Sequence, residues 1–181
     1  LGDPSQSELS LETGQATLPI ARHRYALGGA GNVVNNLSAM GCRRIHAFGV
    51  TGSDPWGREM TLCLNAVGAD PEGMLQQDAD WSTLAYVKVH VDNEETERLD
   101  FGSSNALDDD TGEELVQRLE GALPDIDLVI VNQQVRTGIH TDAFRARLAA
   151  LIEAHPKTPF LVDSRHHGGA YPGAHLKVNE H

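Results

Sequence analysis

The stretch Gly28-Gly29-Ala30-Gly31-Asn32 decides how the rest of the sequence is interpreted. Because glycine has no Cβ and tolerates positive φ, a glycine cluster lets a ligand come close to backbone N–H groups. A polar segment, predicted as a half-exposed strand over 20–27, leads into the cluster. An amphipathic helix follows the cluster and is predicted to end near Gly41. The glycines therefore lie where a strand passes into a helix.

Considered alone, the cluster is compatible with a general phosphate cradle or with the degenerate dinucleotide fingerprint of a Rossmann-type oxidoreductase. The fingerprint is incomplete, because its third glycine is missing and the preceding segment is polar instead of buried. An oxidoreductase of this kind would be stabilised against heat by NAD, and we expect no such effect. The assignment therefore depends on the motifs that follow the cluster.

The composition limits the classes of protein to which the chain can belong. With 181 residues and 40% hydrophobic content, it suits one globular domain or a large part of one. The formal net charge of -12 leaves no basic surface for nucleic acid or an anionic membrane. Cys42 and Cys63 are far apart, which excludes a disulfide framework and a cysteine zinc cluster. We therefore expect a cytoplasmic protein without nucleic-acid or membrane partners.

The segments after the glycine cluster alternate between strand and helix patterns. A strand is predicted over 44–50, and Asp54 then supplies an N-cap carboxylate ahead of Pro55 at the first helical position. Apolar residues recur at helical spacing until Gly68, which ends that helix. The succession of strand, helix, strand and helix predicts an α/β fold.

Residues 84–91 alternate strictly between apolar and polar side chains, which predicts a strand with one apolar face and one wet face. Asp92-Asn93 is a turn dipeptide, and residues 98–101 are predicted to form the returning strand. This part of the chain is therefore predicted to be an antiparallel hairpin.

Two wholly apolar runs, 128–131 and 160–162, are typical of strands buried on both faces of a sheet. The second run leads directly into Asp163-Ser164-Arg165. Because ligands in open α/β sheets bind at the carboxyl ends of strands, these polar residues are well placed for function. A short strand predicted over 175–178 leads into Asn179.

Six short motifs occur along the chain in the order Gly28-Gly29-Ala30-Gly31-Asn32, Leu37-Ser38-Ala39-Met40-Gly41, Gly52-Ser53-Asp54-Pro55-Trp56-Gly57, Arg98-Leu99-Asp100-Phe101, Leu161-Val162-Asp163-Ser164-Arg165 and Leu176-Lys177-Val178-Asn179. In this order they resemble the ribokinase/PfkB carbohydrate-kinase family, most closely its heptose-phosphate kinase-like branch. The resemblance implies an α/β ribokinase-like fold, a three-layer αβα sandwich with a small β lid. The lid would be built by the strands at 20–27 and 84–101, within a single partial domain over 1–181.

The resemblance also implies roles for individual residues. The N-terminal glycine motif of the family lines the sugar site, so Gly28, Gly29 and Asn32 would hold sugar hydroxyls. An Asn amide offers both a donor and an acceptor to neighbouring hydroxyls. Lys88 and Arg98, on the predicted lid, are candidates for binding a phosphate or acidic group of the substrate.

The resemblance implies ATP and Mg²⁺ as cofactors, and it places Asp163 and Asn179 on the cofactor side of the site. Asn179 matches the first position of the family's N-x-x-E motif. The family's late G-A-G-D motif, whose aspartate takes the proton of the attacking hydroxyl, does not occur in these 181 residues. The adjacent His166-His167 does not make a metal site, because neighbouring side chains point apart and no third ligand stands at useful spacing.

Kinases of this family need roughly 300 residues, of which this chain would supply about the N-terminal 60% without the opening strand. We therefore expect a fragment of an ATP-dependent kinase for a sugar or sugar phosphate, inactive by itself. The alternative is a non-catalytic sugar-binding or dimerisation module derived from a kinase. We also expect a homodimer through the β lid, because exposed apolar strand edges favour association.

Overall fold

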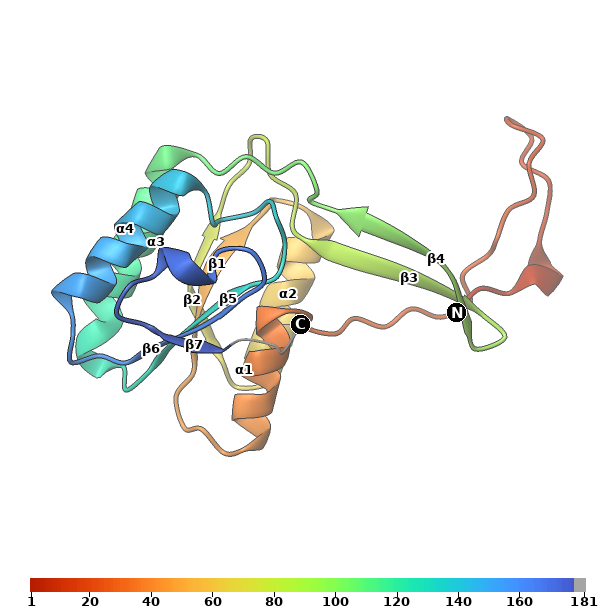
Figure 1. Cartoon of the computed structure of the whole chain (residues 1–181). Coiled ribbons are helices and arrows are strands. Elements are labelled where there is room, and N and C mark those ends of the chain that lie inside the picture. Colours follow the sequence, from red (N-terminus) through yellow and green to blue (C-terminus); the bar gives the residue numbers. More distant parts are fainter. Residues whose placement is uncertain (178–181) are drawn as a thin grey trace.

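The structure is a computed structural model that describes residues 1–177, in which strands lie between the helix pair α1 and α2 and the helix pair α3 and α4 (Figure 1). The predicted α/β pattern is therefore confirmed. Among the described residues, no helix combines the length and apolarity needed to span a bilayer. The elements are α1 (Ala30–Ala39), β1 (His46–Thr51), α2 (Pro55–Ala66), β2 (Asp70–Gln76), β3 (Ala85–Val91), β4 (Glu94–Phe101), α3 (Asp109–Ala122), β5 (Val129–Gln133), α4 (Asp142–Ala154), β6 (Phe160–Ser164) and β7 (His175–Lys177), with 3-10 turns at Pro4–Gln6, Leu123–Asp125 and Gly168–Ala170.

The strands form three groups. β1 pairs in parallel with β2, and β5, β6 and β7 form a second parallel sheet in that order. β3 and β4 form an antiparallel hairpin. The apolar runs predicted as buried strands are β5 and β6, and Phe160 and Val162 of β6 are 1% and 0% exposed.

Two hydrophobic clusters of unequal size lie on the two sides of the strands. The larger one fills the space between β5, β6, α3 and α4 and also takes in Leu75 of β2. The smaller one, between β1 and α2, consists of the buried residues Ala47, Leu64 and Ala69. The residues of the larger cluster are Leu75, Leu115, Val116, Leu119, Leu123, Val129, Val131, Phe144, Leu148, Leu151, Ile152, Phe160, Val162 and Tyr171.

The hairpin predicted at 84–101 is confirmed, and it projects away from the body of the molecule beside the N-terminal segment (Figure 1). Asp92 and Asn93 both have positive φ, 50° and 69°, as a two-residue hairpin turn requires. The register pairs Tyr86 with Asp100 and Lys88 with Arg98, so these side chains share one face of the hairpin.

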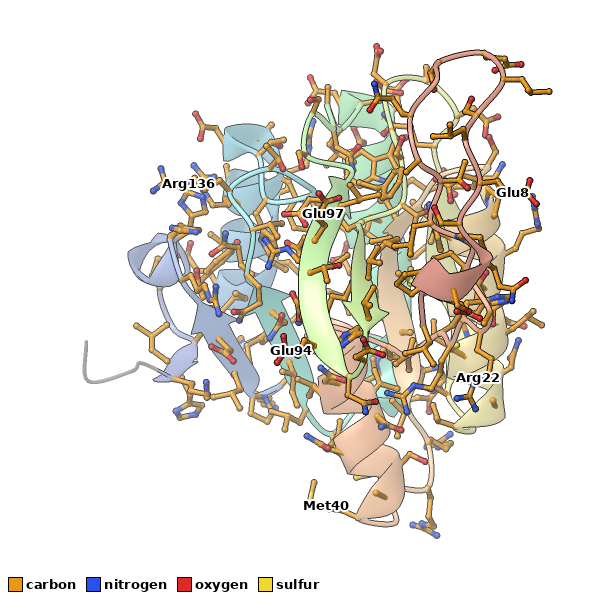
Figure 2. All side chains as sticks on the ribbon, turned by 90° about the vertical axis from the view of Figure 1, so that its right-hand side faces the viewer. Glu8, Arg22, Met40, Glu94, Glu97 and Arg136 are labelled. Carbon is orange, nitrogen blue, oxygen red and sulfur yellow. The ribbon has the colours of Figure 1, made fainter. Side chains whose placement is uncertain are left out.

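The strand predicted at 20–27 is wrong. In the described part of the chain these residues are extended but belong to no strand, and Ile20 alone makes an isolated bridge, to Gly2. A strand needs a hydrogen-bonded neighbour along its length. The His90 carbonyl of β3 instead accepts a hydrogen bond from the Gly2 N–H. Figure 2 shows Arg22 on this segment, beside the hairpin that carries Glu94 and Glu97.

β2 lies in a part of the chain where the sequence analysis placed no element. Pro71 and Gly73 both disfavour strands, so the sequence pattern does not indicate a strand there. β2 is an edge strand, paired only with β1 in the described residues, and proline is tolerated there. The last predicted strand is β7, and the residues from Val178 onwards, Asn179 included, lie outside the described residues.

Candidate functional site

A pocket of about 330 Å³ lies where the carboxyl ends of β5 and β6 meet the N-terminus of α1 and the root of β3. Its walls thus come from four elements that are far apart in the sequence. Such a position, at the carboxyl ends of parallel strands, is where α/β folds bind their ligands. The lining residues are Gly29, Val33, Tyr86, Asn132, Gln134, Asp163 and Arg165.

Gly29 and Val33 form the α1 wall of the pocket. Gly29 is the N-cap of α1 and has φ 48°, a conformation that side chains with a Cβ rarely adopt. A Cβ on Gly28 or Gly29 would meet no heavy atom within 4 Å, so the backbone there is open to an incoming group. The helix begins without a side-chain cap, and the N–H groups of Gly31 and Asn32 donate to the carbonyls of Gly28 and Gly29 at 2.8 and 3.1 Å.

The opposite wall is fixed by Gln133, whose side chain is 1% exposed. Its Oε1 accepts hydrogen bonds from the Ser164 hydroxyl at 2.7 Å and from the His166 backbone N–H at 2.9 Å. Its amide nitrogen donates to the Val135 carbonyl, and its own carbonyl accepts the Arg165 N–H at 3.0 Å. Gln133 therefore joins the segments that follow β5 and β6.

Alternation along the strands then places the neighbouring side chains in the pocket. Gln134 follows Gln133 and lies on the pocket side, and Asp163 and Arg165 flank Ser164 in the same way. Asp163 forms an ion pair with Lys177 of β7 at 3.0 Å. The pocket thus presents amides, a paired carboxylate and a guanidinium, a set that can bind hydroxyl groups and an anion.

The hairpin contributes Tyr86 to the pocket, and Lys88 and Arg98 lie beside it. The Arg98 guanidinium lies 4.8 Å from the centre of the Tyr86 ring and is bound by Asp100 at 2.7 Å. Lys88 is bound by Glu95 at 2.8 Å, and this hydrogen bond lowers the pKa of Glu95. Both cations are therefore neutralised within the hairpin.

The other predicted site residues are more dispersed. Gly29 and Asp163, predicted for the sugar and cofactor sides, line the same pocket. Gly28 lines a larger neighbouring cavity. Asn32 is exposed and is absent from the lining of both cavities in the described structure, while Asn179 lies outside the described residues.

The sequence analysis missed the pocket residues Tyr86, Asn132 and Gln134 and the apolar Val33, whereas it had noted Arg165 together with Asp163 as well placed for function. Asn132 and Gln134 come at the end of the apolar run of β5, a signal of the same kind as the one that drew attention to Asp163. No local sequence pattern marks Tyr86 as a site residue, because its place in the pocket with Gly29 depends on how the hairpin packs.

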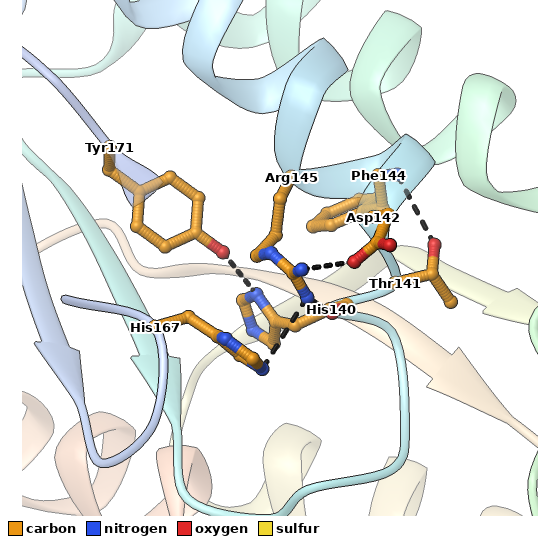
Figure 3. A network of polar contacts seen from close by, with 7 residues as sticks. All are labelled: His140, Thr141, Asp142, Phe144, Arg145, His167 and Tyr171. Atoms are coloured by element: carbon orange, nitrogen blue, oxygen red, sulfur yellow. Dashed lines mark hydrogen bonds and ion pairs between the residues drawn. The ribbon is translucent and has the colours of Figure 1, made fainter. Parts of the chain in front are cut away.

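Behind this wall, a polar network joins α4 to the segments after β5 and β6 (Figure 3). The ring of His140 hydrogen-bonds through Nδ1 to the Tyr171 hydroxyl at 2.6 Å. Arg145 donates to the His140 carbonyl and to Asp142, and its guanidinium lies 3.4 Å from Nε2 of His167. Burial lowers the pKa of His140 to about 4 and raises that of Tyr171 to about 12, so both are neutral near pH 7.

Asp54 connects the start of the hairpin, just before β3, to α2. Its carboxylate accepts hydrogen bonds from the backbone N–H groups of Gly57, at 2.8 Å, and Thr83, at 2.7 Å. Thr83 in turn accepts the Gly52 N–H through its hydroxyl at 2.8 Å. Partial burial acts to raise the pKa of Asp54, but these hydrogen bonds outweigh it and the pKa is lowered. The predicted helix cap is confirmed, and it also positions β3.

The sequence is similar to curated proteins named bifunctional protein HldE. It is 29% identical to that of Citrifermentans bemidjiense over 92% of this chain and 34% of the relative, and 31% identical to that of Mesorhizobium japonicum over 83% of this chain and 30% of the relative. The chain thus spans about a third of the length of these relatives.

Two solved structures resemble the fold. The PfkB protein from Polaromonas sp. JS666 has a TM-score of 0.59 at 17% identity, over 90% of this chain and 52% of that one. The phosphofructokinase-2 from Escherichia coli in complex with fructose-6-phosphate has a TM-score of 0.57 at 19% identity, over 84% and 48%. At such identities the likeness concerns the fold, which is of the ribokinase-like α/β type.

A family model described as pfkB family carbohydrate kinase matches residues 4–163. The match extends from the N-terminal segment to the end of β6 and includes the glycine motif, the hairpin and most of the pocket wall. The chain therefore belongs to the pfkB family of carbohydrate kinases.

Proposed function

We propose that the natural protein containing residues 1–181 transfers phosphate from ATP to a hydroxyl of a sugar or sugar phosphate, and that the pocket holds the sugar. The observation that carries this proposal is the meeting of the glycine backbone at Gly29 with the polar ends of β5 and β6 in one pocket. Family membership supports carbohydrate phosphorylation in general.

The size and chemistry of the pocket fit a small polyol. Its volume of about 330 Å³ is at the lower end of the range of small-molecule sites. Asn132 and Gln134 each offer a donor and an acceptor, as vicinal hydroxyls require. The open backbone at Gly28 and Gly29 lets a flat ring approach the start of α1, where no side chain caps the helix. We assign the sugar hydroxyls to these groups.

Arg165 is the cation best placed to bind an acidic or phosphorylated substrate. Its side chain lines the pocket, and the guanidinium can bind a phosphate with two parallel hydrogen bonds. Lys88 and Arg98 would contribute only after leaving Glu95 and Asp100. We therefore propose Arg165 as the main anion anchor and the two hairpin cations as secondary ones.

The described residues fit the sugar better than the nucleotide. Mg²⁺ needs several oxygen ligands, and among residues 1–177 no group of three or more His, Cys, Asp or Glu side chains could hold a metal ion. When bound, Mg-ATP would supply the phosphoryl group and neutralise its charge. We propose that Asp163 with Lys177 borders the nucleotide side, and that the aspartate that takes the hydroxyl proton lies outside this chain.

The test is ADP release by the complete product of the natural gene with a panel of sugars, sugar phosphates and nucleosides. We expect sugar-dependent ADP release for at least one sugar or sugar phosphate, and none from the 181-residue chain alone. Absence of turnover with the whole panel would overturn the kinase assignment. Calorimetry with the same panel separates the alternative, a non-catalytic sugar-binding module, which would bind a sugar without releasing ADP.

We also propose that the hairpin, acting as a lid, forms a homodimer contact. It carries Leu99 and Phe101 on one face with 50% and 38% of their surfaces exposed, apolar surface that a partner could cover. Leu99→Lys is expected to shift the complete protein from dimer to monomer in sedimentation analysis. A protein that is monomeric without the substitution would contradict this contact.

A further inference from the structure

Tyr171 lies in the segment after β6 and belongs to the larger hydrophobic cluster, with 2% of its surface exposed. Its hydroxyl is a polar group in an apolar environment, where a hydroxyl without a partner costs free energy. The partner is Nδ1 of His140 at 2.6 Å, and the His140 ring packs edge-on against Phe144 with the ring centres 5.5 Å apart. Neither His140 nor Tyr171 lines the candidate pocket, so a role of this pair in the pocket must come from the segments that it joins.

The His140 ring also hydrogen-bonds to the backbone of Asn132, at the end of β5. Burial lowers the pKa of His140, and the bond to Asn132 acts in the opposite direction, as expected when the ring donates to a carbonyl. A neutral imidazole has one N–H donor and one acceptor nitrogen. Nδ1 therefore accepts the hydrogen bond of the Tyr171 hydroxyl. A directional chain of hydrogen bonds thus leads from Tyr171 through His140 to Asn132.

α4 fixes the same residues from a third direction (Figure 3). Arg145 donates to the His140 carbonyl, and Asp142 holds Arg145 through an ion pair. The Arg145 guanidinium also lies 3.4 Å from Nε2 of His167, in the segment that leads to Tyr171. The start of α4 therefore contacts both the segment after β5 and the segment after β6.

These two segments carry polar side chains of the candidate pocket. Asn132 and Gln134 lie at the end of β5 and just after it, and Arg165 directly follows β6. A guanidinium binds an anion with two parallel hydrogen bonds only when the two groups are aligned. Binding geometry of this kind has to be held to within about 0.5 Å. The distance between the segments therefore decides whether one ligand can contact the amides and Arg165 together.

The two segments are joined at two places. Gln133 joins them close to the strand ends, through its bonds to the Ser164 hydroxyl and the His166 N–H. His140 and Tyr171 join them again farther along the chain. A single attachment would leave the segments free to rotate about it, whereas two attachments fix the distance between them.

We propose that Tyr171 and His140 are positioning residues of the pocket, which hold Arg165 at a fixed distance from Asn132 and Gln134. The inference rests on the proposed function, because it takes the pocket as the site of the sugar. Loss of the Tyr171 hydroxyl alone would keep the ring in the hydrophobic cluster and release the segment that carries Arg165. The effect would therefore be on ligand binding more than on the core.

The experiment compares Tyr171→Phe with Tyr25→Phe in the complete natural protein. The first substitution removes the hydroxyl that bonds to His140. The second removes the hydroxyl of a tyrosine that is 42% exposed and hydrogen-bonds to no group within residues 1–177. Hydrogen exchange of the amides of 164–171 and nitrogen NMR of the His140 ring are measured in both. We expect Tyr171→Phe to speed up this exchange several-fold and to shift the Nδ1 resonance, and Tyr25→Phe to change neither.

The KM for the sugar that supports ADP release distinguishes a positioning role from a purely structural one. Tyr171→Phe should raise this KM about fivefold at nearly unchanged kcat, because binding is weakened equally before and in the transition state. Tyr25→Phe should leave it unchanged.

Exchange rates and Nδ1 resonances that are equal in the two variants would overturn the link between the segments. Faster exchange in Tyr171→Phe with an unchanged KM would overturn its positioning role. If no sugar releases ADP from the unsubstituted protein, the proposed function fails and the positioning role fails with it. Exchange and NMR would still report on the hydrogen bond itself, so the two failures are distinguishable.

Discussion

The two halves of the molecule differ in how completely they are packed. Around β5 and β6, α3 and α4 bury a continuous cluster in which Phe160 and Val162 are almost inaccessible. Around β1, the buried cluster is limited to Ala47, Leu64 and Ala69, and α1 has only half-buried and exposed residues. The better-packed half holds the polar wall of the pocket, whereas the other half presents glycine backbone and the hairpin. The pocket thus lies between a well-packed polar wall at the ends of β5 and β6 and a less packed wall formed by the start of α1 and the hairpin.

The largest expected effect is the loss of a core side chain in the better-packed half. Phe160→Ala removes a ring that is 1% exposed and should destabilise the protein by about 3–5 kcal/mol. In the 181-residue chain, Leu37→Ala should cost less than about 1 kcal/mol, because Leu37 is only half-buried there. Urea unfolding of both variants measures the difference. Equal losses would show that the two halves are packed alike.

The next largest effect is a loss of stability in acid, which we expect from the buried His140 in the β5–β6 half. The pKa of His140 is about 4 in the folded protein and near 6.5 in the unfolded chain, so between these values only the unfolded chain binds the proton. Stability should therefore fall by about 3 kcal/mol as the pH drops from 6.5 to 4. His140→Asn should flatten this slope in urea titrations at several pH values. An equal slope in His140→Asn and in the unsubstituted protein would refute the assignment.

Gln133 should matter to stability and Gln134 to binding, although they are neighbours in the sequence. Gln133→Leu leaves the Ser164 hydroxyl and the His166 N–H without their acceptor and should cost about 1–3 kcal/mol. Gln134→Leu, which changes a half-buried pocket residue, should cost much less. Thermal unfolding of the pair measures this contrast. Similar losses would mean that both side chains serve packing.

The smallest expected effect concerns the attachment of the hairpin to the less-packed half. Asp54→Ala removes the cap of α2 and the acceptor of the Thr83 N–H, at a cost of about 1 kcal/mol. Hydrogen exchange should then speed up at Thr83 and at the start of β3, while β6 is unaffected. Ser53→Ala, one residue away and exposed, is the control. Unchanged exchange at Thr83 would show that Asp54 does not anchor the hairpin.

Much of the fold could be predicted because its signals are local. The strict alternation before Asp92-Asn93 predicted the hairpin, and two apolar runs predicted β5 and β6. The errors arose where the presence of a strand depends on its pairing with a neighbouring strand. Residues 20–27 have a strand-like pattern but no neighbouring strand along their length in the described structure, and β2 is a strand despite Pro71 because only one of its edges is paired there.

The candidate site was only partly predictable for a related reason. Gly29 and Asp163 stood out because each follows a recognisable motif, and they do line the pocket together. Asn132 and Gln134 follow an apolar run as Asp163 does, but their place beside Gly29 depends on the order of the strands. The place of Tyr86 depends on how the hairpin packs, which no single segment indicates. The pairing of Lys88 with Glu95 depends likewise on the register of β3 and β4, whereas Arg98 and Asp100 lie two residues apart on β4 itself.

The most direct test of the proposed pocket is the KM for the sugar of Gln134→Ala in the complete natural protein, measured with the sugar that supports ADP release. Loss of a pocket hydrogen bond should raise KM for the sugar about tenfold and leave KM for ATP nearly unchanged. Gln117→Ala is the matched control, since Gln117 is exposed on α3 and bonds only Glu113 among the described residues. A KM for the sugar that is equal in Gln134→Ala, Gln117→Ala and the unsubstituted protein would contradict a sugar site between Gly29 and the ends of β5 and β6.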